Sequence, residues 1–83
     1  MPTLKVETTN TWQIVATTSQ AFILENASSY NVQVNFNTAL PSVDAAYHTL
    51  KAGEAILRMG LTGNVYVRGS EGDLGLAFVI VTT

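Results

Sequence analysis

Cysteine is absent from this chain, and histidine occurs once, at position 48. Without cysteine no disulfide can reinforce the fold, and one histidine falls far short of the roughly four ligands that a structural zinc site needs. A domain of 83 residues buries only about 60–65% of the surface that its unfolded chain exposes, so it commonly needs reinforcement from disulfides, a metal or association. Because disulfides and a structural zinc site are both excluded, association with further copies is the remaining way to reinforce the fold.

Charged side chains are scarce as well. Asp, Glu, Lys and Arg make up 12% of the chain, against roughly 25% in an ordinary soluble domain. Apolar residues stand at 47%, so neutral polar residues take the place of the missing charges. Because such a surface loses less desolvation free energy when another protein covers it, the composition favours a permanent assembly. The net charge of −2 argues against a disordered chain.

Several classes of partner are disfavoured by what the chain lacks. Its four fixed cations are scattered along the sequence, so no basic stripe is available to neutralise phosphates, and we expect no nucleic-acid partner. The longest apolar run, residues 76–81, is far shorter than the ~20 residues of a membrane helix, and we expect no membrane partner. Because the first ten residues lack the apolar core of a secretion signal, we expect synthesis in a cytoplasm.

Short alternating or apolar runs, separated by turn residues, recur from end to end and predict an all-β fold. We expect a small antiparallel β-sandwich or jelly-roll-like barrel of seven or eight short strands, forming one domain over residues 1–83. The runs are TLKVETT (3–9), TWQIVAT (11–17), AFILEN (21–26), YNVQVNFN (30–37), AYHTL (46–50), EAILRM (54–59), NVYVRG (64–69) and LGLAFVIVTT (74–83).

The alternation also predicts which side chains share a face. In the fourth run Val32, Val34 and Phe36 fall on one face, opposite a row of polar side chains. In the second run Trp12, Ile14 and Ala16 are expected on one side of a strand. The first run reads as an edge strand, and residues 69–75 (GSEGDLG) as a hairpin loop between the last two strands.

The last run is apolar on both faces. Leu76, Phe78 and Ile80 alternate with three small apolar residues, Ala77, Val79 and Val81. A strand that is apolar on both faces is covered on both, and two packed layers supply only one cover. The side with Ala77, Val79 and Val81 therefore meets either a loop of the same chain or another subunit, and we favour a subunit interface.

Residues 45–55 (AAYHTLKAGEA) hold the only histidine and allow two local structures. Val43, Ala46, Tyr47 and Leu50 have helical spacing, which predicts a short helix. The alternative, which we favour, is a loop followed by a strand that ends in a turn at residues 51–54. In that turn Gly53 would take the third position, where a type II turn requires positive φ.

His48 has little around it that indicates catalysis. No nucleophile-elbow pattern such as G-x-S-x-G occurs in the sequence, so we expect no enzyme, no catalytic residue and no cofactor. We expect the ring instead to face away from Tyr47 and to hydrogen-bond a neighbouring main chain or a second subunit.

Two further groups of residues could bind a ligand. Glu71 and Asp73 could hold calcium, although the D-x-[DN]-x-[DN]-G pattern is missing and a solvated loop tip is favoured, so we expect no metal. The aromatic residues could form a sugar-binding platform, although each is also placed to fill the core or its rim. These are Trp12, Tyr30, Tyr47 and Tyr66.

The segments DAAYHTLKAGEAI (44–56) and NVYVRGSEGDLGLAFVIVTT (64–83) resemble the small β-sandwich virion proteins of tailed phages and prophages. In that family a Tyr-His-x-Leu-x-x-Gly-Glu segment precedes a Val-Tyr-Val-Arg strand and a valine-rich last strand. Residues 12–36, with a tryptophan-started strand, a strand that ends in asparagine, a serine turn and alternating valines, fit the same pattern.

The resemblance implies a non-enzymatic structural protein located in the virion. It would form a homo-oligomer, with a trimer favoured, and would bind the major capsid protein or other virion proteins. The first expectation is a capsid decoration (cement) protein that stabilises the shell, and the alternative within the class is a neck, tail or head-fibre component. A carbohydrate-binding module for host recognition is the alternative from another class.

The resemblance also implies roles for individual residues. Five of them would set the strand and turn of the central segment: Tyr47, His48, Leu50, Gly53 and Glu54. Tyr66 and Arg68 would lie on a strand that faces a partner, so they join Ala77, Val79 and Val81 as residues of an oligomer or shell interface.

Overall fold

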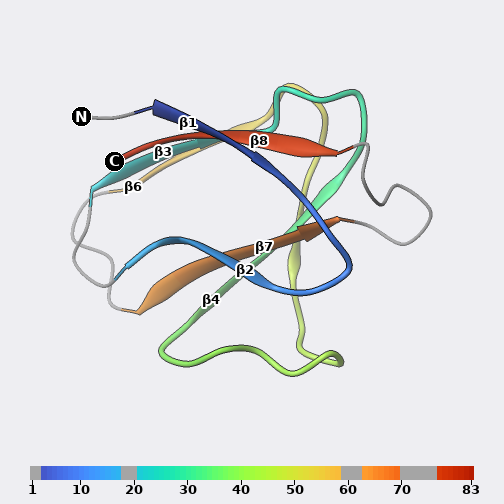
Figure 1. Cartoon of the computed structure of the whole chain (residues 1–83), viewed down its shortest axis with the longest axis vertical. Coiled ribbons are helices and arrows are strands. Elements are labelled where there is room, and N and C mark those ends of the chain that lie inside the picture. Colours follow the sequence, from blue (N-terminus) through green and yellow to red (C-terminus); the bar gives the residue numbers. More distant parts are fainter. Residues whose placement is uncertain (1–2, 18–20, 59–62, 70–76) are drawn as a thin grey trace.

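The structure is a computed structural model, and it describes residues 3–17, 21–58, 63–69 and 77–83. These residues form eight β-strands and no helix, which confirms the predicted all-β fold (Figure 1). The strands are β1 (Thr3–Glu7), β2 (Gln13–Ala16), β3 (Phe22–Glu25), β4 (Val32–Asn37), β5 (His48–Leu50), β6 (Ala55–Arg58), β7 (Asn64–Gly69) and β8 (Phe78–Thr82).

The strands form two antiparallel sheets of four that pack face to face. Sheet A has the order β1-β8-β3-β6, and sheet B has the order β2-β7-β4-β5. Figure 1 shows the two layers, with β1, β3, β6 and β8 above and β2, β4 and β7 below. As predicted, the first run lies at an edge, since β1 pairs only with β8.

The core lies between the sheets and follows the period-2 alternation of the strands. Along β4, Val32 and Val34 are fully buried, whereas Asn35 and Asn37 lie on the outer side with higher exposure. Along β7, Val65 and Val67 are buried in the same way. The core side chains of sheet B are Ala16, Val32, Val34, Leu50, Val65 and Val67, and those of sheet A are Phe22, Leu24, Val79 and Val81, with Ala77 just before β8.

The predicted hairpin between the last two strands is wrong. β7 pairs with β2 and β4 in sheet B, whereas β8 pairs with β1 and β3 in sheet A. The connection between them therefore crosses from one layer to the other, and its residues 70–76 lie outside the described part of the chain. Strand propensity and a turn-rich linker indicate that two strands follow each other in the sequence. They do not indicate that the two strands pair, because a sandwich can place consecutive strands in different sheets.

The expectation that Trp12, Ile14 and Ala16 share one face is also wrong. Ile14 pairs with Tyr66 on the outer side of sheet B and is half exposed, whereas Ala16 is buried in the core. The register shifts between these two residues, at a bulge. One extra residue in a strand moves the following side chains to the opposite face.

The last strand is covered differently from the prediction. Ala77, Val79 and Val81 are buried in the core, where they face sheet B. These three side chains are therefore not available to another subunit, and the assignment of an interface to them is corrected. The side of β8 that turns away from the core carries Phe78 and Ile80, which are half-buried. β8 is a central strand whose Ala/Val side meets the second sheet.

The central segment forms a loop and a strand, as favoured, and not a helix. A turn at residues 42–45 is closed by a hydrogen bond from the Ala45 amide to the Ser42 carbonyl (3.1 Å). The strand β5 is then only three residues long. The helical spacing of the apolar residues is coincidental here, because Val43, Ala46 and Tyr47 are exposed and only Leu50 enters the core.

Candidate functional site

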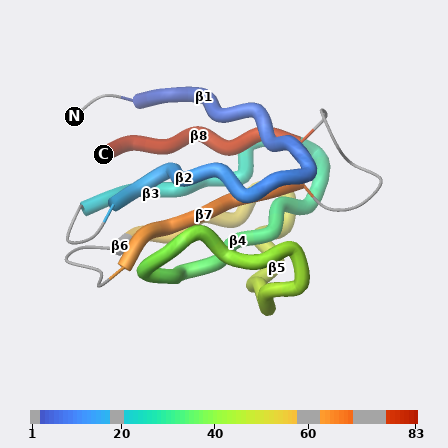
Figure 2. Tube along the Cα trace, turned by 60° about the horizontal axis from the view of Figure 1, so that its bottom comes forward, coloured from blue at the N-terminus to red at the C-terminus, as the bar shows by residue number. Residues whose placement is uncertain are grey.

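Residues 38–47, between β4 and β5, lie across the outer side of sheet B and are called the strap below. Figure 2 shows this loop in green, in front of β4 and β7. Three side chains of the sheet B side donate hydrogen bonds to its carbonyl oxygens: Trp12 Nε1 to Ser42 (3.0 Å), Asn35 Nδ2 to Ala46 (2.7 Å) and Arg68 Nη1 to Val43 (3.0 Å). The strap is therefore fixed along its length by groups that the sheet points outward.

Arg68 is the centre of this arrangement. Its Nε donates to Gln33 Oε1 at 2.6 Å, and its guanidinium carbon lies 4.2 Å from the centroid of the Trp12 ring and 5.9 Å from that of Tyr47. A guanidinium at such a distance from a ring face is attracted by the π-electrons. Arg68 is half-buried and its hydrogen bonds join β7, β4 and the strap. These hydrogen bonds are therefore made within this chain, and the assignment of Arg68 to a partner-facing strand stays a prediction.

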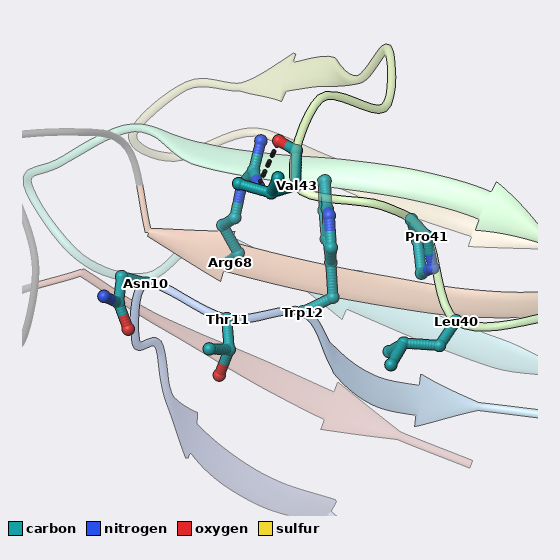
Figure 3. Close-up of a pocket in the computed structure, with 7 residues that line it drawn as sticks. All are labelled: Asn10, Thr11, Trp12, Leu40, Pro41, Val43 and Arg68. Carbon is teal, nitrogen blue, oxygen red and sulfur yellow. Dashed lines mark hydrogen bonds between the residues drawn. The ribbon is translucent and has the colours of Figure 1, made fainter.

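A cavity of about 210 Å³ lies between the strap and the start of β2 (Figure 3). Trp12, Leu40, Pro41 and Val43 supply most of its wall, and Arg68 closes one side. Arg68 is also the one charged side chain in the lining. The cavity offers neither a nucleophile–base pair nor a general acid, so its chemistry is that of an apolar contact surface.

Tyr47 and His48 line one open hollow of about 210 Å³, but their rings face different neighbours. Tyr47 ends the strap next to Arg68, whereas His48 opens β5 and places its ring 6.0 Å from that of Phe36 at a tilt of 56°. Within the described part of the chain the His48 side chain makes no hydrogen bond, so the expected bond to a neighbouring main chain is not found. His48 and Glu54 line one shallow hollow of about 320 Å³ without a salt bridge between them.

The turn after β5 agrees with the prediction. Gly53 has a φ of +83°, and the Glu54 amide donates to the Lys51 carbonyl at 3.0 Å. The Glu54 carboxylate in turn accepts from the Lys51 amide at 2.6 Å. Leu50, just before the turn, is buried in the core. Leu50, Gly53 and Glu54 therefore shape this segment.

A buried amide that sequence reasoning did not single out joins the two sheets. Asn26 follows β3 and is fully buried, and its side chain makes four hydrogen bonds. Its Nδ2 donates to the carbonyls of Tyr30 (2.6 Å) and Leu50 (2.8 Å), and its Oδ1 accepts from the amide (3.1 Å) and the hydroxyl (2.6 Å) of Ser28. The Asn-x-Ser pattern at a strand end is the signal that could have indicated it.

The aromatic residues do not form an exposed platform. Trp12 and Tyr66 are buried at 8% and 6% exposure, and the face of the Trp12 ring is covered by Arg68. Tyr30 and Tyr47 are partly exposed but lie on separate loops. Tyr66 therefore acts within sheet B, where its hydroxyl accepts a hydrogen bond from Asn64 Nδ2 (3.2 Å).

Metal ligands do not gather in the described part of the chain: it contains no cluster of three or more His, Asp or Glu side chains that could hold an ion. Glu71 and Asp73, considered as calcium ligands, lie outside the described residues. Among the described residues no helix is long and apolar enough to cross a membrane.

No segment within residues 3–17, 21–58, 63–69 and 77–83 lies across the outer side of sheet A, which is called the open face below. Strand register places two rows of side chains across it. One row is Thr3, Thr82, Ile23 and Leu57, and the other is Lys5, Ile80, Glu25 and Ala55. Leu57 is 71% exposed and Ile23 43%. Together with half-buried Phe78 and Ile80, these residues form an apolar surface flanked by one cation, Lys5, and two anions, Glu7 and Glu25.

Comparisons of the chain with models of protein families, with curated proteins and with solved structures find no match. The assignment of a function therefore rests on the residues and on their arrangement.

Proposed function

We propose that this chain is a non-enzymatic structural protein that works as a homo-oligomer within a larger protein assembly. The observation that carries the proposal is the open face, on which Ile23, Leu57, Phe78 and Ile80 lie together with no described segment across them. Contiguous exposed apolar patches on soluble proteins mark contact sites. The low content of charge supports the same conclusion, because few charges have to be desolvated when the face is covered.

The setting we propose is a phage or prophage particle, with capsid decoration as the first possibility. Its support is the resemblance of residues 44–56 and 64–83 to small virion β-sandwiches. A decoration protein gains its avidity from many weak contacts repeated by symmetry, which suits a chain with neutral polar surfaces. A neck, tail or head-fibre component has the same support, and the trimer that the resemblance implies remains a prediction.

An enzyme and a carbohydrate-binding module have less support. The cavity beside Arg68 holds no acid–base pair, and His48 contacts Phe36. A sugar platform requires exposed aromatic faces, but Trp12 and Tyr66 are buried. The variant His48→Ala should therefore assemble like the original chain. Glycan binding that disappears in Tyr30→Ala or Tyr47→Ala, with assembly unchanged, would favour the carbohydrate-binding alternative.

Two measurements on the purified chain test the proposal. The molecular mass in solution, measured by sedimentation over a range of protein concentrations, should exceed that of one chain. The protein should also co-sediment with capsids assembled from the major capsid protein of the same genome. A chain that stays monomeric at millimolar concentration would contradict the proposal that it forms a homo-oligomer. An oligomer that binds neither capsids nor tails nor fibres would contradict only the proposed location in the virion.

A further inference from the structure

We propose that two copies of this chain pack open face against open face, about a two-fold axis that runs along β8. In this arrangement Lys5 of each copy meets Glu25 of the other, on both sides of a central contact between the two Ile80 side chains. The inference rests on the proposed function and deepens it, because it names the contact surface, the symmetry and the register of self-association.

The symmetry follows from the number of surfaces involved. A patch that covers an identical patch forms an isologous contact, and such a contact closes as a two-fold dimer. A ring of three copies would need two different patches that fit each other at a closing angle. The open face is a single surface on one side of the molecule, so it meets itself. This dimer departs from the trimer that the resemblance implies.

The register follows from the row Lys5, Ile80, Glu25 and Ala55. β8 lies between β1 and β3, so Lys5 and Glu25 stand on opposite sides of Ile80 at the same height along the strands. A half-turn about an axis along β8 exchanges the two sides and keeps the height. Lys5 of one copy is thereby brought opposite Glu25 of the other. Two stacked sheets lie about 10 Å apart, a gap that a lysine and a glutamate can span together.

The charges also decide between two possible axes. A half-turn about an axis that runs across the strands, through the same row, would set Lys5 against Lys5 and Glu25 against Glu25. Like charges directly opposite each other are destabilising. The axis along β8 replaces both repulsions with two attractive pairs, so this row of the open face is self-complementary in one of the two orientations.

The state of the two charged groups in the single chain fits this contact. Lys5 Nζ lies 4.5 Å above the centroid of the Phe78 ring and 4.0 Å from Glu7 Oε1, so it is held over the open face. Glu25 is exposed and makes no salt bridge with another described side chain. In the dimer Glu25 would gain a cation, and the apolar side chains between the two pairs would be removed from water.

Charge reversal on the full-length chain tests the register. In Lys5→Glu and in Glu25→Lys, two symmetry-related pairs per dimer become repulsive. We expect the dimer dissociation constant, measured by sedimentation at low salt, to rise about tenfold in each, given that an exposed pair contributes up to about 1 kcal/mol. The control variants Lys51→Glu and Asp44→Lys make the same changes of charge away from the open face. They should change the dimer dissociation constant by less than about twofold.

An equimolar mixture of the two reversed variants gives the decisive readout. In a dimer of Lys5→Glu with Glu25→Lys, both pairs are again of opposite sign, so the mixed dimer should form within about threefold of the original affinity. The Lys5→Glu copy still carries the altered contact with Glu7, so recovery reports on the contact between copies and not on folding of one copy.

The outcomes separate this inference from the proposed function. A two-chain mass with recovery in the mixture supports both. A mass of three chains, or a dimer that the reversals and the mixture leave unchanged, would overturn the two-fold open-face contact while self-association stands. A chain that is monomeric at every concentration would overturn the proposed function and the inference with it.

Discussion

The outer sides of the two sheets differ in what covers them. Sheet B carries the strap, which is held by hydrogen bonds from Trp12, Asn35 and Arg68. Sheet A presents Ile23 and Leu57 to the surface with no described segment across them. Both sheets belong to one small sandwich and have four strands each, so the difference arises from the side chains that point outward.

The comparison shows what an irregular segment needs in order to lie on a sheet. The carbonyl groups of the strap require hydrogen-bond donors once they leave water, and the outward side chains of sheet B supply an indole, an amide and a guanidinium. The outward side chains of sheet A are mainly threonine, isoleucine, leucine and phenylalanine, with one lysine and two glutamates toward its edges. They suit a second apolar surface better than an irregular main chain. One side is covered within the chain, and the other has no cover among the described residues.

The largest expected effect comes from the buried amide that joins the two sheets. Asn26→Ala should lower the free energy of unfolding by about 3 kcal/mol or more, because two carbonyls and the Ser28 hydroxyl lose their buried partner. Urea unfolding followed by circular dichroism measures this loss. Asn31→Ala, at an exposed position, is the matched control and should change stability by less than about 0.5 kcal/mol.

Asn26→Ala should also affect the two outer sides together, since Asn26 follows a strand of sheet A and bonds the end of β5 in sheet B. Hydrogen exchange should rise in β3 and in β5 alike. If only the strap lost protection, the amide would belong to the cover of sheet B and not to the joint between the layers.

The second largest effect is expected at Arg68, and it distinguishes the outer side of sheet B from that of sheet A. Arg68→Met should lower the free energy of unfolding by about 2 kcal/mol, because the buried Gln33 side chain and the Val43 carbonyl lose a charged donor. Trp12 is the only tryptophan, so its quenching by acrylamide reports whether the strap loosens, and we expect quenching to increase. Lys5→Met on the open face should cost less than about 0.5 kcal/mol.

Equal losses in Arg68→Met and Lys5→Met would contradict the distinction between a covered and an open side. Arg68→Lys sharpens the test, because an ammonium group is a point charge that cannot reproduce the planar fork of the guanidinium. Its stability should lie between that of Arg68→Met and that of the original chain.

A smaller effect is expected at the rim of the cavity. Trp12→Phe keeps an aromatic ring against Arg68 but removes the N–H that donates to the Ser42 carbonyl. One hydrogen bond of this kind contributes about 1 kcal/mol, and urea unfolding should show a loss of that size. Should the loss reach that of Arg68→Met, the ring and not the arginine would be the main support of the strap.

The smallest effect on folding is expected on the open face. Ile23→Thr and Leu57→Thr should change the stability of the dilute monomer by less than about 0.5 kcal/mol, because both side chains are already exposed. The same substitutions should weaken self-association at higher concentration, and Leu40→Thr on the strap should not. A large loss of monomer stability in Leu57→Thr would show that this face is covered within the chain.

Much of the fold could be predicted from alternation along the strands. The alternation along residues 32–37 placed Val32 and Val34 on one face, which is the core face, and Gly53 marked its turn by the need for positive φ. These features are local, since each depends on residues that are close together in the sequence.

The errors came from features that depend on distant partners. Nothing in residues 11–17 distinguishes a bulged strand from a regular one, so Ile14 and Ala16 were placed on the same face. The apolar sides of the last strand look alike in sequence, and only the position of sheet B shows that Val79 and Val81 face the core. The contacts of Arg68 with Gln33 and with the strap also join residues far apart in the sequence, so the sequence did not indicate them.

The most direct test of the account compares the two outer sides in solution. Methyl signals of Ile23, Leu57 and Ile80 report on the open face, and those of Leu40 and Val43 report on the strap. With a paramagnetic co-solute present, raising the protein concentration should reduce the broadening of the first group and leave that of the second unchanged. Protection of the strap methyls instead, with the open-face methyls still fully accessible, would contradict the account.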